Sequence, residues 1–539
     1  MRLPRLHARV SVHTKATVNV QGDAYACEVA SLSVSGAMLV GGPRLDLGRE
    51  LLMEIDVPVA PERKTLMLRA QVVRHQDLGG AELGIGVAFQ GTTLETEGLL
   101  ALAVTEAYKR LGARVLGQVR NEMQRRGVTD ISAVADELQR IKEEQARAHL
   151  FAADLFTEEG SNAIAHIVSG TTGESRECIV WSLNLYLGLN RVPAVIEKVR
   201  AAVARYGTGA GTSPPSGGMS RLHNALETRI ATMVGKPKAL IFSTGYAANL
   251  GALSALPGPK DLVLLDRESH ASMIDGVRLS GKKWLAFAHN DVADLEAKLE
   301  KYAPHHENVF VAVEGAYSMS GDLAPLREIA ALKKKHKFFL YVDEAHTFGF
   351  YGDRGAGYCQ AQGVTDQVDF IMSTFSKATA SIGGFVACEE KYATLLQATA
   401  TPYIFQACLP PPDAAAILAA LDEIQNDASH ARSLHENNRV MRAELSARGF
   451  DLGQSQSPVI PVYVPDLEKL YRLCAQLYLE GIFTVPVVYP AVGANEGRLR
   501  FIVNAHHTRA QIDRTVEVLA RHARDLGILP ENAAVHEAA

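Results

Sequence analysis

The chain has 539 residues, of which 47% are hydrophobic and 21% charged, and its formal net charge is −5 at pH 7. A chain of this length exceeds what one hydrophobic core organises, so we expect a multi-domain soluble protein. The small net charge argues against a surface built for polyanions, and no apolar run approaches the ~18 residues of a membrane span.

The cysteines are scattered and include no CxxC pair. They are Cys27, Cys178, Cys359, Cys388, Cys408 and Cys474. This pattern argues against a disulfide scaffold and against a zinc site, so we expect a reducing compartment and no metal. The opening segment MRLPRLHARV is basic but has no apolar segment after it, which argues against a secretory signal. We therefore expect a cytoplasmic protein and leave open its attachment to the inner face of the membrane.

Residues 10–92 contain six short runs of alternating or β-branched residues, separated by Gly, Pro and Asp. The runs are ATVNV, YACEVASLS, GAMLVGG, LLMEIDVPV, LMLRAQVVRH and LGIGVAFQ. Six strands at this spacing predict a small β-barrel rather than a βαβ unit. We place this barrel at residues 1–105.

A basic leader and a serine-rich turn accompany the predicted barrel. Arg5 and Arg9 are four positions apart in the leader, and Ser31, Ser33 and Gly36 form an SxSxxG turn. Together with the segments VVRH and GIGVAF, these motifs follow the order of the PilZ domain, which the region resembles. The resemblance implies that the five residues bind cyclic di-GMP, because an arginine fork can bond a phosphate and stack on guanine. Ser31 stands where the family prefers Asp or Asn, so the alternative is a barrel that has lost its ligand.

Residues 106–158 are expected to form a helical connector. The stretch that ends at Gly127 has helical periodicity, and a second helix is expected to begin near Asp130 and to include Leu155. Charges separate its apolar residues, which is typical of a helix that lies across another surface or bridges domains. We expect packing and no catalytic residue here.

The pattern changes after residue 159 to apolar strands that alternate with helical stretches. Examples of the strands are KALIF, DLVLLD, NVFVAVE, FFLYVD and VDFIM. Such alternation predicts a mainly parallel sheet with helices on both faces, in which ligands collect at the carboxyl ends of the strands. We place this large domain, with a linking helix, at residues 159–452 and a small α/β lobe at residues 453–530. Residues 531–539 are expected to be a frayed tail.

One segment, VDFIMSTFSKATASIGGF at residues 368–385, combines a strand with a lysine and hydroxyl groups. Lys377 follows the apolar run closely enough to be partly desolvated, which favours the neutral amine that a Schiff base requires. Thr374 and Ser376 lie beside it and can donate to a phosphate. An isolated lysine of this kind is more often a surface residue, so the interpretation depends on the other strand ends.

Polar residues follow the other predicted strands as well. The turn of Thr244, Gly245 and Tyr246 opens a helix, where backbone N–H groups can cradle a phosphate. Asp343 and His346 end the strand FFLYV and can present two polar groups to one planar ligand. The remaining strand ends carry His270 and Ser318.

The segment DEAH admits a rival of another class, a nucleotide hydrolase in which the acidic pair holds Mg²⁺. A partial P-loop, GVRLSGKK, runs from Gly276 to Lys283. Lys283 replaces the Ser or Thr that ligates the metal, and the segment lies in a helical stretch instead of directly after a strand. We therefore disfavour the hydrolase.

Within residues 160–530, a series of segments resembles the sequence pattern of a known family. They are NLYLGLN, STGYAANL, HASMIDGVRLSG, HNDVADLE, EGAYSMSGDLAPL, YVDEAHTFGFYGDRGAG, STFSKATASIGGF, PYIFQACLPP, EGIFTVPVVYP and GRLRFIVNAHHT. In order and spacing they closely resemble the α-oxoamine synthases, which are pyridoxal-phosphate enzymes of the fold-type I aminotransferase superfamily. The resemblance is closest to the serine palmitoyltransferase branch. It implies an α/β fold-type I aminotransferase-like large domain.

The resemblance implies that pyridoxal 5'-phosphate is the cofactor and gives each strand end a role. Lys377 would hold the cofactor as a Schiff base and shuttle a proton, Asp343 would keep the ring nitrogen protonated, and His270 would stack on the ring. His346 would bond the phenolic oxygen of the ring. The implied phosphate and ring contacts are Thr244, Gly245, Tyr246, Ser318, Thr374 and Ser376.

The resemblance also implies the reaction, a decarboxylating Claisen condensation by an acyltransferase of sphingolipid biosynthesis. An amino acid, expected to be L-serine, would attack a long-chain acyl thioester of coenzyme A or acyl carrier protein, lose CO₂ and give a 3-oxo amine. Asn184 and Arg500 would contact the amino acid, and Arg498 is the alternative to Arg500 as the carboxylate ligand. The implied assembly is a homodimer, with cyclic di-GMP as a regulator.

Departures from the family leave alternatives open. Residues 207–223 do not carry Ser-Arg and Gly-Thr at the positions where the family has them ahead of its histidine, and they contain Pro214 and Pro215 instead. Gln406 and Ala407 replace a hydroxyl pair of the family. The amino acid could instead be alanine or glycine, as in an 8-amino-7-oxononanoate synthase or a glycine C-acetyltransferase. In another class, the chain would be a catalytically inactive, cofactor-bearing scaffold under nucleotide control.

Overall fold

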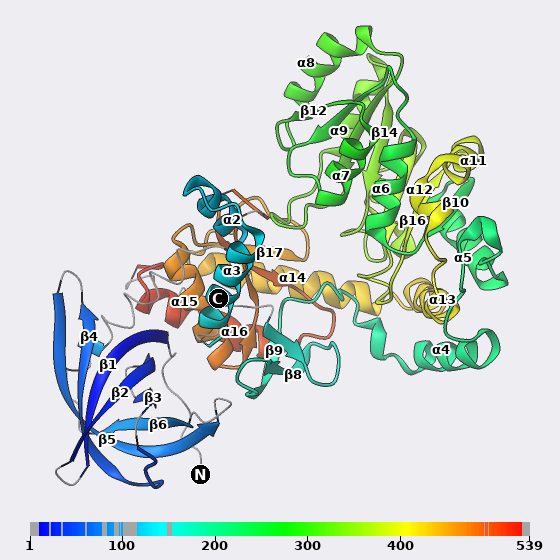
Figure 1. The fold of residues 1–539 in the computed structure, drawn as a ribbon. Coiled ribbons are helices and arrows are strands. Elements are labelled where there is room, and N and C mark those ends of the chain that lie inside the picture. The colour runs from blue at the N-terminus through cyan, green and yellow to red at the C-terminus, as the bar shows by residue number, and fades with distance from the viewer. Residues whose placement is uncertain are drawn as a thin grey trace.

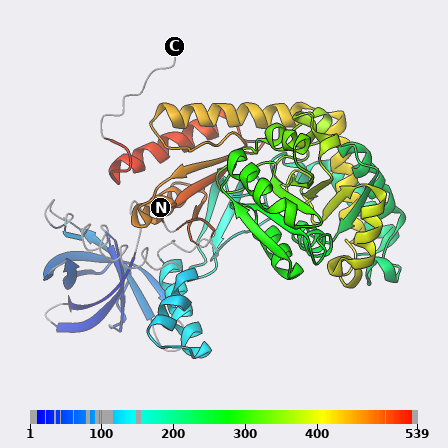
Figure 2. The ribbon, with the colours of Figure 1, turned by 90° about the horizontal axis from the view of Figure 1, so that it is seen from above.

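The computed structural model has three parts (Figure 1). The residues it describes are 10–20, 23–33, 36–41, 43–59, 62–77, 83–90, 96, 99–100, 116–147, 154–489, 491–493 and 495–530. A barrel in blue, a smaller lobe in orange and red, and a large α/β domain in green and yellow follow one another across the molecule (Figures 1 and 2). The smaller lobe lies between the other two.

Six antiparallel strands close into the N-terminal barrel in the order β1-β2-β3-β6-β5-β4. Their bounds are β1 Val10–Val20, β2 Asp23–Ser33, β3 Gly36–Val40, β4 Glu50–Val59, β5 Glu62–Asp77 and β6 Leu83–Gln90. Alternate residues point inward because successive side chains of a strand face opposite sides. In β4, Leu51, Met53 and Ile55 are buried, whereas Leu52 and Glu54 are exposed. The six alternating runs of the sequence therefore form the six strands.

The residues predicted to bind cyclic di-GMP fall only partly within the described chain. Arg5 and Arg9 lie outside the described residues. Ser31 and Ser33 belong to β2, but their side chains lie outside the described set. Gly36 opens β3, where a side chain would collide with a backbone carbonyl oxygen of β6. The barrel itself therefore requires glycine at this position, independently of any ligand.

Two helices, α2 (Leu116–Arg125) and α3 (Ile131–Arg147), form the described part of the connector, and α3 contacts β1. Gly127, with a positive φ of 79°, follows α2, as is common where a helix ends. The prediction for Leu155 is wrong, because this residue lies in a strand, β7 (Leu155–Thr157), and not in a helix. Pairing with a neighbouring strand overrides the helical periodicity there.

A seven-stranded sheet forms the large domain, in the order β10-β16-β15-β14-β13-β11-β12. The strands are β10 Lys238–Phe242, β11 Leu262–Asp266, β12 Lys283–Phe287, β13 Val309–Glu314, β14 Phe339–Asp343, β15 Phe370–Thr374 and β16 Gly384–Cys388. Pairing is parallel from β12 to β15, whereas β16 is antiparallel to both of its neighbours. This confirms the predicted mainly parallel sheet. The nearly continuous apolar runs of its strands reflect burial on both faces.

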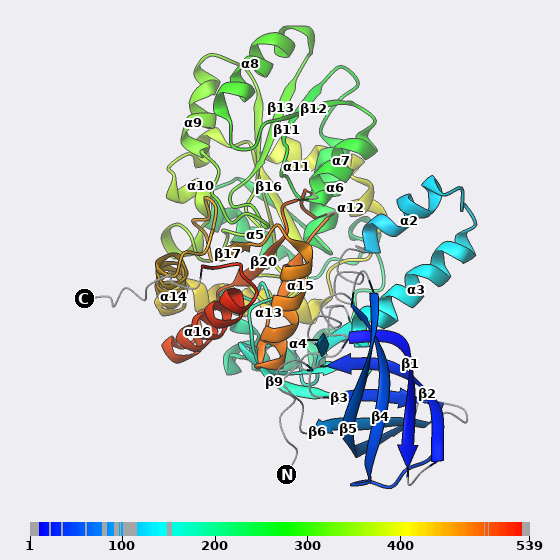
Figure 3. The ribbon, with the colours of Figure 1, turned by 90° about the vertical axis from the view of Figure 1, so that its left-hand side faces the viewer.

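Helices cover both faces of this sheet (Figure 3). In β11, Leu262 and Leu264 join one core cluster, whereas Val263 and Leu265 join the other. The α-helices between residues 193 and 447 are α4 Pro193–Tyr206, α5 Arg221–Val234, α6 Gly245–Ala255, α7 Ala271–Ser280, α8 Val292–Tyr302, α9 Leu326–Ala331, α10 Tyr358–Ala361, α11 Glu390–Thr399, α12 Thr401–Phe405, α13 Pro411–Asn426 and α14 Ser429–Ala447. Of these, α14 leads from the large domain to the small lobe (Figure 1). Within the described residues, we find no helix with the length and apolarity needed to cross a bilayer.

The small lobe contains a three-stranded sheet in the order β17-β20-β19 and two helices, α15 and α16. The bounds are β17 Val459–Tyr463, α15 Leu467–Leu479, β18 Ile482–Phe483, β19 Val485–Val487, β20 Arg498–Ile502 and α16 Arg509–Asp525. Strand β18 lies in a second sheet, where it pairs in parallel with β9 (Ser175–Val180), followed by β8 (Ile164–Ser169) and β7. Strands β8 and β9, which lie within the predicted large domain of residues 159–452, are therefore in one sheet with β18 of the lobe predicted at residues 453–530.

Candidate active site

Polar strand ends of the large sheet meet at one edge. β13 ends at Glu314, β14 at Asp343 and β15 at Thr374, and these three strands are neighbours. Parallel strands place their carboxyl ends at the same edge, where ligands bind in this architecture. Helices α6 and α7 begin there too, with Thr244 and His270 as their caps. Side chains that are far apart in the sequence are thus brought together.

Lys377 lies just past the end of β15 and is half-buried. Burial lowers the pKa of its amine; the carboxyl groups of Asp343 and Glu314 oppose this shift, and Arg500 adds to it. The net shift is downward, which increases the fraction of neutral amine. The backbone turns tightly after the lysine, where Ala380 has a positive φ of 51°. A neutral amine in this position is suited to forming a Schiff base.

Asp343 is fixed by a series of hydrogen bonds. Its Oδ2 accepts from Nδ2 of Asn249 at 2.7 Å, and its Oδ1 accepts from the N–H of Ala345 at 2.9 Å. Oδ1 of Asn249 accepts in turn from the hydroxyl of Tyr341 at 2.8 Å. Asp343 and Asn249 are almost fully buried, so these bonds set the direction of the carboxylate. A carboxylate held in this way can stabilise a protonated ring nitrogen.

His270 is connected to the same group of side chains. Its Nδ1 lies 2.7 Å from the hydroxyl of Ser272, and that hydroxyl accepts from Nδ2 of Asn249 at 2.9 Å. The backbone N–H of His270 donates to Oε1 of Glu314 at 2.5 Å. His270 is exposed to solvent on one side, and desolvation by the surrounding protein atoms lowers the pKa of its imidazole, which favours the neutral ring near pH 7. A neutral ring held from two sides is suited to stacking on an aromatic cofactor.

His346 is buried beside Tyr186, and its Nδ1 lies 2.6 Å from the phenol oxygen. Burial lowers the pKa of His346 well below its ordinary value, and burial also raises the pKa of Tyr186. The protonated phenol therefore donates to Nδ1 of the neutral imidazole, which places the imidazole proton on Nε2. Nε2 can then donate to a ligand oxygen, the role predicted for His346.

Glycine residues and hydroxyl groups form a narrow turn at the start of α6. A Cβ atom on Gly245 would come within 2.6 Å of Cβ of Thr374, and one on Gly384 would come within 2.6 Å of Cα of Gly245. The hydroxyls of Thr374 and Ser376 are 2.8 Å apart, and the side chain of Thr244 caps the helix. Close backbone approach, hydroxyl groups and helix N–H groups are together the features of a phosphate cradle.

Tyr246 differs from the rest of this turn because its side chain is 44% exposed. Its ring lies edge-on to His270, with the centroids 6.3 Å apart, and its hydroxyl donates to Asp275. The hydroxyl is therefore engaged, and the backbone N–H in the first turn of α6 is the group that suits a phosphate.

The two candidate arginines on β20 have different surroundings. Arg498 donates to the hydroxyl of Tyr463 at 2.9 Å and to two backbone carbonyl oxygens. Arg500 donates from Nη1 to the carbonyl oxygen of Ser318 at 3.1 Å, whereas its Nε is buried without a hydrogen-bond partner. A buried donor without a partner is costly unless a ligand supplies one. Arg500, more than Arg498, is therefore suited to bind a carboxylate.

Asn184 also has a buried atom without a partner. Its Oδ1 accepts no hydrogen bond from the described residues. The chain reaches Tyr186, which contacts His346, two residues later. Ser318 is almost fully buried in the loop whose carbonyl oxygen Arg500 bonds. Oδ1 of Asn184 and Nε of Arg500 can therefore form hydrogen bonds with a small polar ligand.

The arrangement as a whole fits pyridoxal phosphate. The charge of Lys377 lowers the pKa values of His270 and His346, and the charge of Asp343 opposes the lowering of the pKa values of Lys377 and His270, so these groups act within one shared space. They offer a neutral amine, a fixed carboxylate and two neutral imidazoles next to the narrow glycine turn. Each of these groups matches a different part of the cofactor: its aldehyde, ring nitrogen, ring face, phenolic oxygen and phosphate.

Four side chains of this site are missing from the sequence-based predictions: Tyr186, Asn249, Ser272 and Glu314. Glu314 ends an apolar strand, which is the signal that selected Asp343, so it could have been found in the same way. Asn249 lies within α6 and Ser272 within α7, where no pattern in the sequence separates them from other polar helix residues. Their contribution depends on tertiary contacts with Asp343 and His270.

The two segments that depart from the family pattern pack against each other. Pro214, His223, Gln406 and Cys408 line one small cavity. The N–H of Cys408 donates to the carbonyl oxygen of Thr212 at 2.9 Å, which ties the segments together. Oε1 of Gln406 is buried there without a partner. The prolines and Gln406 thus lie in one region, where both departures from the family pattern occur together.

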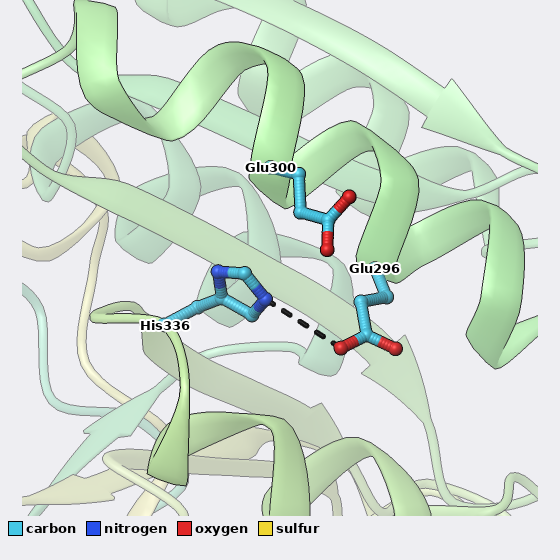
Figure 4. A group of neighbouring side chains, drawn as sticks. All are labelled: Glu296, Glu300 and His336. Carbon is cyan, nitrogen blue, oxygen red and sulfur yellow. Dashed lines mark ion pairs between the residues drawn. The ribbon is translucent and has the colours of Figure 1, made fainter.

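One group of side chains approaches the spacing of a metal site. Glu296 and Glu300 lie one turn apart on α8, and His336 follows α9 (Figure 4). Lys335 already donates to Glu296 at 2.7 Å, and this bond lowers the pKa of the carboxyl group. Helix α8 lies at an outer end of the large domain in Figure 1. We assign the group to surface ion pairing and place no metal in it.

Known proteins match both parts of the chain. Residues 176–519 match the family described as aminotransferase class I and II, and residues 4–106 match the PilZ domain. The serine palmitoyltransferase of Sphingobacterium spiritivorum is 38% identical over 348 residues, which are 65% of this chain and 87% of that protein. The 8-amino-7-oxononanoate synthase of Geobacter metallireducens is 37% identical over 372 residues, which are 69% of this chain and 94% of that protein.

A solved structure is similar over the same region. Serine palmitoyltransferase from S. paucimobilis, with a bound PLP–myriocin aldimine, superposes with a TM-score of 0.70 and is 31% identical. The match covers 74% of this chain and 100% of that chain. The similarity therefore includes the strand-end site and leaves about a quarter of this chain outside the match.

Proposed function

Because the chain belongs to the class I and II aminotransferase family, as a pyridoxal-phosphate-dependent α-oxoamine synthase that carries a PilZ domain, we propose that it condenses L-serine with a long-chain acyl thioester. The reaction would release CO₂ and the free thiol of the acyl donor and give a 3-oxo amine. The observation that carries this proposal is the buried, unpaired Nε of Arg500, whose charge acts on Lys377. It supplies a site for the amino acid's carboxylate beside a reactive amine.

Bound pyridoxal phosphate supplies an electron sink for the α-carbon of the amino acid. Lys377 is proposed to hold the cofactor and, once its amine is free, to accept the α-proton at Nζ. Its lowered pKa keeps that amine neutral for a larger fraction of the time, which a base requires. Asp343 is proposed to hold the ring nitrogen protonated, with its direction set by Asn249.

The two histidines are proposed to orient the cofactor. His346 would donate from Nε2 to the phenolic oxygen, because Tyr186 occupies Nδ1. His270 would lie on the ring face, because Ser272 holds its Nδ1 and Glu314 holds its backbone N–H. Neutral imidazoles suit both positions, since neither places a second positive charge beside a protonated ring.

The amino acid is proposed to lie between Arg500, Asn184 and Ser318. The carboxylate of L-serine would take Nε of Arg500 as a partner, and Oδ1 of Asn184 would accept from a donor of the substrate. Both atoms are buried and without partners in the described structure, so binding would satisfy them.

Product analysis tests this substrate assignment. The full-length protein is incubated with L-serine, L-alanine or glycine, each combined with acetyl, pimeloyl or palmitoyl thioesters of coenzyme A or of acyl carrier protein. We expect the 3-oxo amine of L-serine and the palmitoyl group as the main product by mass spectrometry. A main product from alanine and the pimeloyl group would overturn the assignment.

An 8-amino-7-oxononanoate synthase is the second candidate, because the G. metallireducens relative of that name matches at almost the same identity. A glycine C-acetyltransferase-like activity is distinguished by the same substrate panel. A catalytically inactive scaffold would instead carry the cofactor but fail to exchange the α-proton of any of the three amino acids in deuterated water.

Cyclic di-GMP is proposed to bind the barrel and to regulate the enzyme. The PilZ match extends over residues 4–106 and thus includes the leader with Arg5 and Arg9 as well as the turn with Gly36. Guanidinium groups in such a leader can bond the phosphates and stack on the guanine rings.

A homodimer is proposed as the assembly. Phe405 is 80% exposed, and it directly precedes Gln406 with its buried, unpaired Oε1. An exposed aromatic side chain next to an unsatisfied group suits coverage by a second copy. Light scattering should then give about twice the 58.2 kDa of one chain.

A further inference from the structure

Helix α15 of the small lobe is shared between two hydrophobic cores. One row of its side chains, spaced four positions apart, joins the core of the barrel: Leu467, Tyr471, Ala475 and Leu479. A second set belongs to the core of the catalytic unit: Leu470, Leu473, Cys474 and Leu477. A helix that is apolar on both sides is buried between the structures that it separates. We call the first row the barrel-facing stripe.

The barrel-facing stripe is well packed. Tyr471 is 7% exposed and Ala475 is fully buried. They share a core cluster with Leu99 and Leu100, which follow the barrel strands, and with the inward side chains of the barrel. Figure 1 shows α15 on the side of the catalytic unit that faces the barrel. The barrel therefore contributes to the burial of a helix that belongs to the enzyme.

On its other side, α15 is connected to Arg500 through a single residue, Thr484. Sγ of Cys474 lies 3.4 Å from the carbonyl oxygen of Thr484, and the hydroxyl of Thr484 donates to the carbonyl oxygen of Arg500 at 2.7 Å. Thr484 is 2% exposed, so this bond is shielded from water. Helix α15 also contacts β19 and β20, the strand that carries Arg500. The backbone of Arg500 is thus supported from the helix.

We propose that Thr484 and the barrel-facing stripe are positioning residues for Arg500, so that the barrel helps to hold the amino-acid site in its working geometry. The inference rests on the proposed role of Arg500 as the carboxylate ligand. The Nη1 bond to Ser318 leaves Nε free to bind a ligand, so the direction of Nε depends on where β20 holds the backbone. A displacement of about 1 Å in a substrate-binding group can cost about 100-fold in rate.

Substitution of Thr484 tests the link to Arg500. Thr484→Val removes the hydroxyl at nearly constant volume, and Thr484→Ser keeps the donor. We expect the Kd for L-serine, measured from the change in absorption of the bound cofactor, to rise about tenfold in the valine variant, the loss of about one hydrogen bond. The serine variant should restore it. A valine variant that is less stable but has an unchanged Kd would contradict the proposal.

Substitution on the barrel-facing stripe tests the contribution of the barrel. Ala475→Arg places a large charge in the shared core, and Ala135→Arg places the same side chain at an exposed position of α3 as a matched control. We expect Ala475→Arg to raise the Kd for L-serine about tenfold while the resting absorption of the cofactor persists, and Ala135→Arg to leave it unchanged. We also expect Ala475→Arg to lower the thermal midpoint.

The outcomes separate this inference from the proposed substrate. If Ala475→Arg lowers the thermal midpoint but binds L-serine like the unmodified protein, the positioning role is wrong. If the unmodified protein does not respond to L-serine, the serine assignment fails instead, and the same titrations with alanine and glycine decide the positioning role. An Ala475→Arg variant with an unchanged midpoint would show that the stripe is not packed against the barrel.

Discussion

The barrel and the large domain differ in what their cores contain. Every buried side chain in the described part of the barrel strands is apolar. The large domain, in contrast, buries carboxyl groups at Asp266, Glu314 and Asp343, and it buries Asn249 beside them. Both regions have a continuous apolar core, so folding alone does not explain the difference.

Burying a carboxyl group costs several kcal/mol unless partners compensate for it. The large domain supplies such partners through the bonds of Asp343 to Asn249 and of Glu314 to His270. We infer that the large domain carries its chemistry inside the fold, at strand ends that the core fixes. Of the residues predicted to bind a ligand at the barrel, Ser31 and Ser33 belong to β2 and Gly36 opens β3, and no charged side chain is buried in the described barrel strands. Substitutions in the two regions should therefore have different effects.

Removal of the lysine should have the largest effect. We expect Lys377→Ala to abolish the visible absorption of the lysine-bound cofactor and to reduce turnover by more than about 10⁴-fold, because both the covalent link and the base are lost. Lys236→Ala is the matched control, since burial also lowers the pKa of Lys236 but its amine donates to two backbone carbonyl oxygens. The control should lose stability and keep the absorption. Persistence of the absorption in Lys377→Ala would refute the assignment.

Substitutions of the two arginines of β20 should have different effects, one on binding of the amino acid and the other on the stability of the protein. We expect Arg500→Lys to raise the KM for the amino acid about 100-fold, because a lysine cannot form the bidentate contact with a carboxylate. Arg498→Lys should change KM much less and lower the free energy of unfolding, since it breaks bonds to Tyr463 and to backbone oxygens. Steady-state kinetics and denaturant titration check both. The reverse pattern would make Arg498 the carboxylate ligand.

A partly buried ion cluster should make the stability of the large domain depend on pH. His289 contacts Asp266 at 2.9 Å, Asp322 at 2.6 Å and Glu268 at 3.7 Å, with Tyr317 edge-on to its ring. Although burial opposes it, hydrogen bonding to the two aspartates raises the pKa of His289 to about 10. Because the folded state binds this proton more tightly, the stabilisation is complete below about pH 6.5 and is lost as the pH rises through about 10.

We expect the free energy of unfolding to fall by about 3 to 4 kcal/mol between pH 7 and pH 10 through this group. His289→Asn should be less stable at pH 7 and should flatten this part of the profile. Denaturant titrations at several pH values measure it. An unchanged slope in the variant would assign the pH dependence to other groups.

The smallest effect is expected in the barrel. We expect calorimetry to detect cyclic di-GMP binding, and Arg5→Ala and Arg9→Ala each to weaken it at least about tenfold through loss of a charge-assisted hydrogen bond. Basal turnover without the nucleotide should not change. Arg44→Ala, an exposed arginine of the barrel outside the motif, is the control. An absence of heat at high micromolar nucleotide with both arginines intact would exclude the sensor role.

The sequence predicts this large domain well because its signals are local. An apolar strand followed by a polar residue places that residue at the ligand edge, and this rule finds Asp343, His270 and Thr374 together. It cannot rank Arg498 and Arg500, since residues two apart in a strand face the same side. Their hydrogen bonds distinguish them, because Arg498 is engaged with Tyr463 whereas Arg500 has a buried Nε without a partner.

The errors arise where structure depends on distant parts of the chain. Leu155 has helical periodicity but pairs with Ser169 in a strand, within a sheet that also contains Ile482. No local pattern carries that information. The helix α15 is similar, because its amphipathic residues predict a helix but do not reveal that the barrel lies against one side of it.

The sheet that joins β9 to β18 has a consequence for how such a protein can arise. Ile179, which precedes the seven-stranded sheet in the chain, pairs with Ile482, which follows it. The entry point of the catalytic unit therefore lies at the lobe that carries Arg500. A domain joined in front of such an enzyme by gene fusion therefore arrives beside the lobe that carries Arg500, and in this chain helices α2 and α3 lie between the two in the sequence.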